Sequence, residues 1–170
     1  CQNVVGTLPK ETITDFNTLV PKQGDEEAMR MFVDSLTGAM RSVFKESDYV
    51  KDANGYPGYP CKLFLSKAEQ VLGIRAFDIR ACGDFYDQEK DALFIGGHGW
   101  GGLFYSYASV EENKQTGIST VVIDYTSDSV HLSVARRMKY TMKSLPDGIY
   151  RILSAELVQS NNDDIYGLGV

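Results

Sequence analysis

The stretch of sequence that decides the fold is VHLSVARRMKYTM, residues 130–142. Apolar side chains recur there at alternate positions, with mostly polar side chains between them. The apolar set is Val130, Leu132, Val134, Met138, Tyr140 and Met142. Because a β-strand turns successive side chains to opposite faces, this alternation predicts a strand with one apolar face and one solvent-exposed face. A sheet built from such strands needs a second layer to cover its apolar face.

Three neighbouring segments also predict strands. They are 103–111, 118–125 and 149–158, and the central strand extends over 130–144. The run Thr120-Val121-Val122-Ile123 is rich in β-branched residues, which favour strands. Turn residues, among them Pro146-Asp147-Gly148, separate the segments. Because short connections join antiparallel neighbours, residues 102–158 predict four consecutive antiparallel strands.

Residues 25–46 predict a long amphipathic helix that covers this sheet. Asp25 occupies the N-cap position, and Glu26 and Glu27 follow in the first turn, where the helix dipole favours negative charge. One stripe of apolar side chains recurs at helical spacing. It contains Met29, Phe32, Val33, Leu36, Met40, Val43 and Phe44.

The connecting region predicts less regular structure. Residues 47–61 are dense in turn residues and predict a loop. A second helix is expected to start at Ser66, which has the capping-box spacing to Glu69, and to stop at Gly73. Residues 74–82 are compatible with either a strand or a third helix.

Composition limits the classes of function. The 170 residues suit one domain, and the formal net charge is −6. An acidic domain is a poor candidate for binding nucleic acid, because that binding depends on neutralising phosphates. No apolar run approaches the roughly 20 residues of a membrane span. With only two histidines and no ligand spacing, we expect no metal site and no cofactor.

Cys1 suggests a cellular location. A mature chain with cysteine at its first position resembles a bacterial lipoprotein, in which that residue carries the lipid. Residues 1–24 would then be a tether, 25–158 a single α+β domain and 159–170 a polar tail. The alternative is a fragment cut at this point by chance. In an oxidising compartment, Cys61 and Cys82 would either form a disulfide or remain buried thiols.

The order of the elements, a long helix, short helices and a long meander, resembles the NTF2-like (cystatin-like) α+β superfamily. The last strand starts with Gly148-Ile149-Tyr150-Arg151-Ile152, which is similar to the terminal glycine–aromatic strand of that superfamily. The resemblance implies a cone in which an N-terminal helix packs on a curved antiparallel sheet of four to six strands. It also implies a small extracytoplasmic lipoprotein, in the periplasm or at the outer membrane surface, that touches the membrane only through its lipid and can form a homodimer.

Two residues are candidates for acid–base chemistry. His98 lies in a glycine-framed stretch beside Trp100, so it fits either a general base in a pocket or a surface loop. Asp124 interrupts an apolar strand, and burial on the core face would raise its pKa. Its parity places it on the face opposite Val121 and Ile123, which favours a structural position.

Arg136 interrupts the apolar parity of its strand, and three interpretations are open. A β-bulge can shift the register there. The arginine can pair with Glu156 or Asp124. It can also anchor an anionic ligand through its guanidinium group.

Aromatic residues in loops are candidates for binding a partner. Tyr56, Tyr59 and Trp100 lie in predicted loops, where we expect them to be exposed. The function expected from the sequence is a non-enzymatic domain that binds a small-molecule or protein ligand at the cell envelope. The alternatives are a small-pocket enzyme of the NTF2-like kind and an envelope structural protein.

Overall fold

The computed structural model describes residues 12–75, 77–95, 104–126 and 134–160. These residues fall into two compact units. The helical unit comprises residues 15–75 and 77–95, and the sheet unit comprises residues 12–14, 104–126 and 134–160. The described chain has one long helix and two four-stranded antiparallel sheets, which confirms the predicted α+β class. The predicted single domain over 25–158 therefore contains two compact units.

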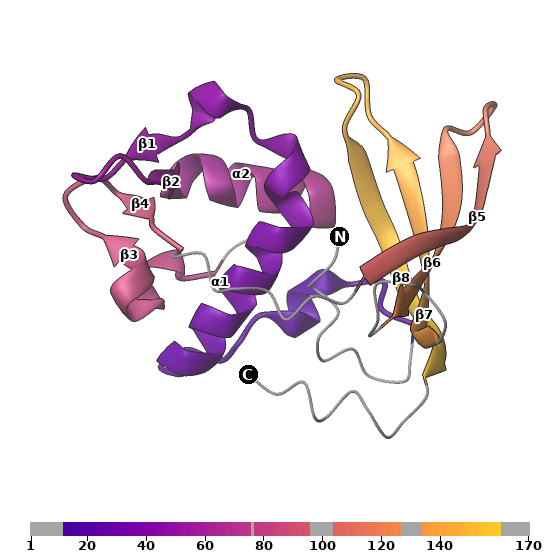
Figure 1. The fold of residues 1–170 in the computed structure, drawn as a ribbon, viewed down its shortest axis with the longest axis horizontal. Coiled ribbons are helices and arrows are strands. Elements are labelled where there is room, and N and C mark those ends of the chain that lie inside the picture. The colour runs from indigo at the N-terminus through magenta and orange to yellow at the C-terminus, as the bar shows by residue number, and fades with distance from the viewer. Residues whose placement is uncertain (1–11, 76, 96–103, 127–133, 161–170) are drawn as a thin grey trace. The chain divides into compact units, whose positions relative to one another are not determined.

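The sheet unit is a four-stranded antiparallel meander (Figure 1). Its strands are β5 (Phe104–Asn113), β6 (Ile118–Thr126), β7 (Val134–Ser144) and β8 (Tyr150–Ser160), in that spatial order. The four predicted strands are confirmed, except that residues 130–133 of the third lie outside the described residues. Ile13 adds a bridge to β8, where its N–H donates to Ala155 O at 2.8 Å and its carbonyl accepts from Ala155 N at 2.9 Å.

The register separates the two faces as the alternation predicts. Ile123 stands opposite Met138, and Val121 stands opposite Tyr140. The side chains of this face are buried on the two central strands, where Met138 is fully inaccessible. On the other face, charged side chains stand opposite one another, as Lys139 and Glu156 do.

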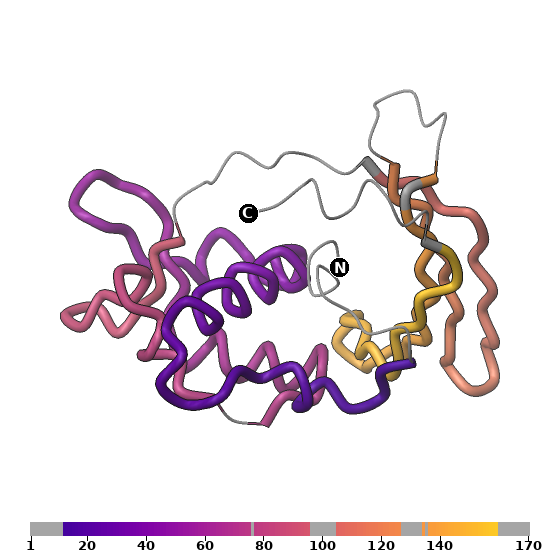
Figure 2. The backbone as a smooth tube through the Cα atoms, turned by 90° about the horizontal axis from the view of Figure 1, so that it is seen from below, coloured from indigo at the N-terminus to yellow at the C-terminus, as the bar shows by residue number. Residues whose placement is uncertain are grey.

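Strand β5 bends near its middle. Its register to β6 shifts between Tyr107 and Ser109, so Ala108 is an extra residue without a partner. Such a bulge bends and twists the strand that carries it. The bend is visible in Figure 1, and Figure 2 shows the β5–β6 hairpin as a long loop of salmon-coloured chain.

The long helix of the helical unit is α1 (Glu26–Met40). Asp25 is its N-cap and accepts a hydrogen bond from Ala28 N at 3.0 Å, as expected. The predicted end at residue 46 is wrong, because the last turn tightens into the 3-10 helix η2 (Arg41–Val43). The helix is also not the first element of the chain. The 3-10 helix η1 (Phe16–Leu19) precedes it, and Phe16 is buried within the segment expected to be a tether.

Within its own unit, α1 contacts α2 and the 3-10 helices η4 (Ile79–Ala81) and η5 (Gly83–Phe85). Figure 1 shows α1 and α2 crossing. The apolar stripe of α1 is buried over most of its length. Its buried members are Met29, Val33, Leu36 and Met40.

Helix α2 (Cys61–Leu72) starts five residues before the predicted Ser66. The preceding strand β2 (Pro57–Pro60) leads directly into it, and Cys61 N donates to Asp91 O at 2.9 Å. This long-range bond outweighs the local capping signal. The predicted stop is confirmed, because Gly73 has a left-handed φ of 69° and its N–H donates to Glu69 O.

The second sheet is small. It contains β1 (Val50–Lys51), β2, β3 (Tyr86–Asp87) and β4 (Ala92–Leu93) in the order β1-β2-β4-β3. The predicted loop 47–61 therefore contains the end of the 3-10 helix η3 (Glu46–Asp48) and two strands. The described residues of the range 74–82 form neither a strand nor an α-helix, and they contain η4.

Candidate functional site

Arg136 lies on the otherwise apolar face of the sheet. It stands opposite Tyr125 of β6, two residues along the strands from the buried pair of Ile123 and Met138. Its side chain is half-buried, and this burial lowers the pKa of the guanidinium from its usual value. The nearby Tyr140 and Tyr125 partly offset the pKa shift, so the arginine lies within electrostatic range of both rings.

Two buried tyrosines from adjacent strands share a hydrogen bond on this face. The hydroxyl oxygens of Tyr125 and Tyr140 are 3.2 Å apart, and both side chains are almost completely buried. Burial is the main cause that raises the pKa of each hydroxyl group. Both therefore remain protonated near neutral pH. One hydroxyl hydrogen joins the pair, and the other is available to a further acceptor.

Strand β5 adds two exposed tyrosines to the same face. Tyr105 stands opposite Tyr125, and Tyr107 stands opposite Ile123. The two rings of β5 meet edge to face with centroids 6.0 Å apart. We call Arg136, Tyr105, Tyr107, Tyr125 and Tyr140 the arginine–tyrosine cluster. It combines a guanidinium group with aromatic surface and hydroxyl donors, which suits an anionic group attached to an apolar body.

The structure tests two of the three interpretations of Arg136, the β-bulge and the ion pair with a carboxylate. A bulge is present, because Tyr125 pairs with Arg136 whereas Thr126 pairs with Val134, so Ala135 is the extra residue. The predicted pairing of Arg136 with Asp124 or Glu156 is wrong. Those carboxylates belong to the opposite face, where their ion pairs are with Arg137 and Lys139.

Asp124 takes part in a bidentate ion pair. Arg137 Nε donates to one of its carboxylate oxygens at 2.6 Å, and Nη2 donates to the other at 2.8 Å. These hydrogen bonds are the main cause that lowers the pKa of Asp124. The structural position that parity favours for Asp124 is therefore confirmed, and the alternative, a carboxyl group whose pKa is raised by burial on the core face, is not what the structure has. His98, the other acid–base candidate, lies outside the described residues.

The loop tyrosines differ in exposure. Tyr56 is 67% exposed, as predicted. Tyr59 is buried in β2, so its predicted exposure is wrong. Its ring meets Phe44, Tyr49 and Phe64 edge to face, and burial raises its pKa to about 12. Trp100 lies outside the described residues.

Cys61 and Cys82 are buried free thiols in the helical unit, which is one of the two expected alternatives. Burial is the main cause that raises the pKa of Cys61 to about 12 and that of Cys82 to about 11. The Cys82 thiol donates to Ile79 O at 2.8 Å. Because the thiolate is the reactive form, these groups are poor nucleophiles near neutral pH. Cys1 lies outside the described residues.

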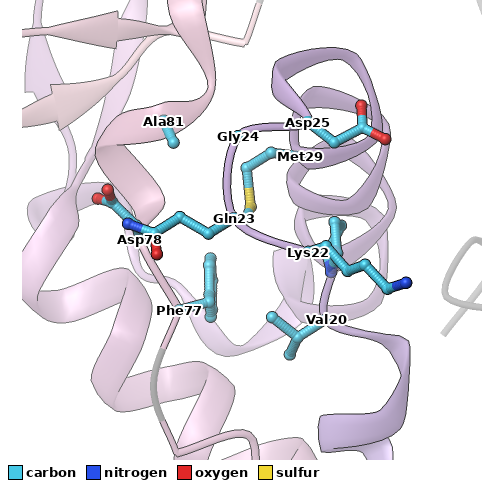
Figure 3. Close-up of a pocket in the computed structure, with 10 residues that line it drawn as sticks. Val20, Lys22, Gln23, Gly24, Asp25, Met29, Phe77, Asp78 and Ala81 are labelled. Atoms are coloured by element: carbon cyan, nitrogen blue, oxygen red, sulfur yellow. The ribbon is translucent and has the colours of Figure 1, made fainter.

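The helical unit also contains an open cavity of about 380 Å³ (Figure 3). It lies between the loop before α1 and the segment that leads into η4. Gln23, Met29 and Phe77 project into this space, whereas the charged ends of Lys22 and Asp25 point away from it. Its wall is mostly apolar, so the cavity suits a small apolar group rather than acid–base chemistry.

The part of the chain that the structure describes has neither a metal-site cluster nor a membrane-spanning helix. Among the described residues, no group of three or more histidine, cysteine, aspartate or glutamate side chains is placed to hold a metal ion. No helix in the described part of the chain is both long enough and apolar enough to cross a membrane.

Comparisons of the chain with protein families, with curated proteins and with solved structures found no match. The resemblance to the NTF2-like superfamily therefore depends on sequence pattern and element order. The candidate site is defined by the geometry of the sheet.

Sequence reasoning named Arg136 but missed its tyrosine partners. Parity places Tyr125 and Tyr140 on one face, but the register between β6 and β7 decides which side chains meet. It also missed a network in the helical unit, where Arg80 Nη2 and Tyr86 Oη both lie 3.1 Å from Asp91 Oδ1. Asp91 has an unusual φ of 45°, which no local motif in the sequence indicates.

The ion pair of Asp124 predicts a pH-dependent contribution to stability. Its pKa is lower in the folded than in the unfolded chain, so its contribution is full above about pH 4 and is lost as pH falls through the folded pKa. At pH 7, Asp124→Asn should lower the free energy of unfolding by roughly 1.5–3 kcal/mol, the range for hydrogen bonds to charged groups. Urea denaturation at pH 7 and at successively lower pH measures both effects.

Glu156→Gln is the matched control for Asp124→Asn, because it removes the exposed ion pair with Lys139 from the same face. Its cost should be about 0–1 kcal/mol. Equal losses in the two variants, or a difference between Asp124→Asn and wild type that is unchanged at low pH, would contradict the assignment.

Proposed function

We propose that the chain is a non-enzymatic binding domain of a cell-envelope lipoprotein, and that the arginine–tyrosine cluster binds an anionic group of its ligand. The position of Arg136 carries the proposal. A half-buried guanidinium group lies on the apolar face of the sheet, near two buried tyrosine hydroxyls. Placing a cation there costs free energy, which is typical of a residue retained for what it does rather than for stability.

The chemistry of the cluster favours a carboxylate or phosphate on an apolar or aromatic body. A guanidinium group donates two parallel hydrogen bonds to either anion, and these bonds strengthen in a half-buried site. Tyr105 and Tyr107 remain partly exposed beside it and offer aromatic surface to the rest of the ligand. Asp124 and Glu156 lie on the opposite face in ion pairs, and Glu112 lies at the far end of β5, so the described carboxylates of the sheet lie away from Arg136.

Phenyl phosphate is a simple probe with this chemistry. We expect it to raise the midpoint of thermal unfolding of the wild-type chain at constant ionic strength, because a ligand that binds only the folded state stabilises it by about 2.7 kcal/mol at 100 times its Kd. Arg136→Gln should abolish the rise. Arg136→Lys keeps the positive charge but cannot donate two parallel hydrogen bonds to the anion, so it should show a smaller rise in the unfolding midpoint.

Arg151→Gln is the matched control for Arg136→Gln. Arg151 lies on β8 and is exposed. Its variant should respond to phenyl phosphate as the wild type does. The same rise in all variants would mean that the anion acts through general surface charge, and no rise in the wild type would contradict the proposed function.

The proposal includes the cone expected from the resemblance, with α1 over the apolar face of the sheet. A four-stranded layer needs a covering layer to bury one face, and Met138, Tyr140 and Ile152 are buried. All five methionines are informative, because Met29, Met31 and Met40 lie on α1 and Met138 and Met142 lie on β7. Selective methyl labelling should give a nuclear Overhauser effect between Met40 and Met138, but none from the exposed Met31 to β7. If no nuclear Overhauser effect is seen between Met40 and Met138, the cone is removed from the proposal.

The lipid anchor at Cys1 is the remaining part of the proposal. It follows from the resemblance to a mature lipoprotein and would place the domain at the periplasmic or outer surface of a bacterial membrane. In the full-length precursor, Cys1→Ser should move the protein from the membrane to the soluble fraction. Unchanged membrane association would refute the anchor while leaving the binding proposal intact.

A further inference from the structure

Strand β5 carries an unusual share of exposed apolar surface. Tyr105, Tyr107 and Val110 are 46%, 65% and 61% exposed, although each lies in a regular strand. They share one face, because they stand opposite Tyr125, Ile123 and Val121 of β6. Three large apolar side chains on one face of one strand form a continuous patch, and such patches on soluble proteins commonly mark an interaction surface.

The same strand is an edge of the sheet. Within the described residues, β5 pairs only with β6, so its outer row of backbone N–H and C=O groups has no strand beside it (Figure 1). Proteins commonly protect such an edge with proline, lysine or an inward-pointing charge. Residues 104–113 contain neither proline nor lysine, so the edge is protected by the bulge at Ala108 and by Glu112, which shares the face of Val110.

The charge at the end of β5 indicates what kind of strand it would accept. Glu111 and Glu112 are adjacent, exposed and outside any ion pair within the described part of the chain. The whole chain has a net charge of −6, so a second copy would meet repulsion at this edge. A basic segment would instead be attracted to it.

We propose that β5 binds an extended, basic peptide segment of another protein by adding it as a fifth strand. The backbone of the segment pairs with the outer edge of β5, its apolar side chains cover Tyr107 and Val110, and its basic residues lie beside Glu111 and Glu112. This mode takes affinity from main-chain hydrogen bonds and specificity from alternate side chains. The inference deepens the proposed binding function by naming a protein partner, but it uses the strand edge and does not depend on Arg136.

A labelled peptide tests the proposal directly. The probe is a fluorescein-labelled nine-residue peptide that alternates valine and threonine and has a lysine pair at each end. A control peptide has proline at four internal positions, which removes donors and prevents continuous pairing. Fluorescence anisotropy should show binding of the first peptide to the wild-type chain, weaker binding at high salt, and at least tenfold weaker binding of the proline peptide.

Variants locate the binding on β5. Tyr107→Lys and the double variant Glu111→Lys/Glu112→Lys should each raise the Kd of the probe at least tenfold. Tyr150→Lys is the matched control, since Tyr150 is 43% exposed on β8, and it should change the Kd less than twofold. Arg136→Gln should also leave the Kd within twofold, which separates this result from the fate of the anion site. Far-UV circular dichroism confirms that each variant is folded.

Three results would overturn the proposal. They are no binding by the wild-type chain, equal binding of the proline peptide, and a wild-type dimer in sedimentation that Tyr107→Lys dissociates. The last result would assign the edge to a second copy of this chain instead.

Discussion

The register between β6 and β7 determines what the sheet unit can do. It places Tyr125 opposite Arg136 and Ile123 opposite Met138 on one face. Because side chains alternate with a period of two, a shift by one residue would exchange the faces of β7. Arg137 and Lys139 would then lie on the apolar face, and the ion pair between Asp124 and Arg137 would be lost. The apolar core, the ion pairs and the arginine–tyrosine cluster therefore depend on one alignment.

That alignment also explains why Arg136 is unusual. A bulge can move a polar side chain from the apolar face to the solvent-exposed face. The extra residue, Ala135, lies next to Arg136 in the chain. The bulge nevertheless leaves Arg136 on the face of Met138 and Tyr140, since all three follow the same alternation. A bulge at this point could have turned the Arg136 side chain to the solvent-exposed face, but the observed register keeps it on the apolar face. The neighbouring Arg137 takes the structural role instead, in its ion pair with Asp124.

The sequence predicts well those features that depend on neighbouring residues. The four strands, the Asp25 cap and the Gly73 stop follow from alternation, side-chain capping and left-handed backbone, and each is present. Features that depend on distant pairings were not predictable in the same way. Helix α2 starts at Cys61 because of a bond to Asp91, and Tyr59 is buried because β2 pairs with β4, more than thirty residues later in the chain. Within the site, parity identified Arg136 as exceptional, but only the register revealed its tyrosine neighbours.

Local charge matters more than total charge for this chain. The net charge of −6 argues against nucleic acid as a partner, but it does not describe any one surface. Arg136 offers a positive centre on β7, whereas Glu111 and Glu112 give the end of β5 a negative one. Glu111 stands opposite Thr120, five residues along β6 from Tyr125, which stands opposite Arg136. At about 3.3 Å per residue along a strand and about 4.8 Å between strands, the two centres are roughly 19 Å apart, which is about two Debye lengths at physiological ionic strength. Salt therefore screens each centre from the other, so an anion near Arg136 and a basic strand on β5 respond to different local charges.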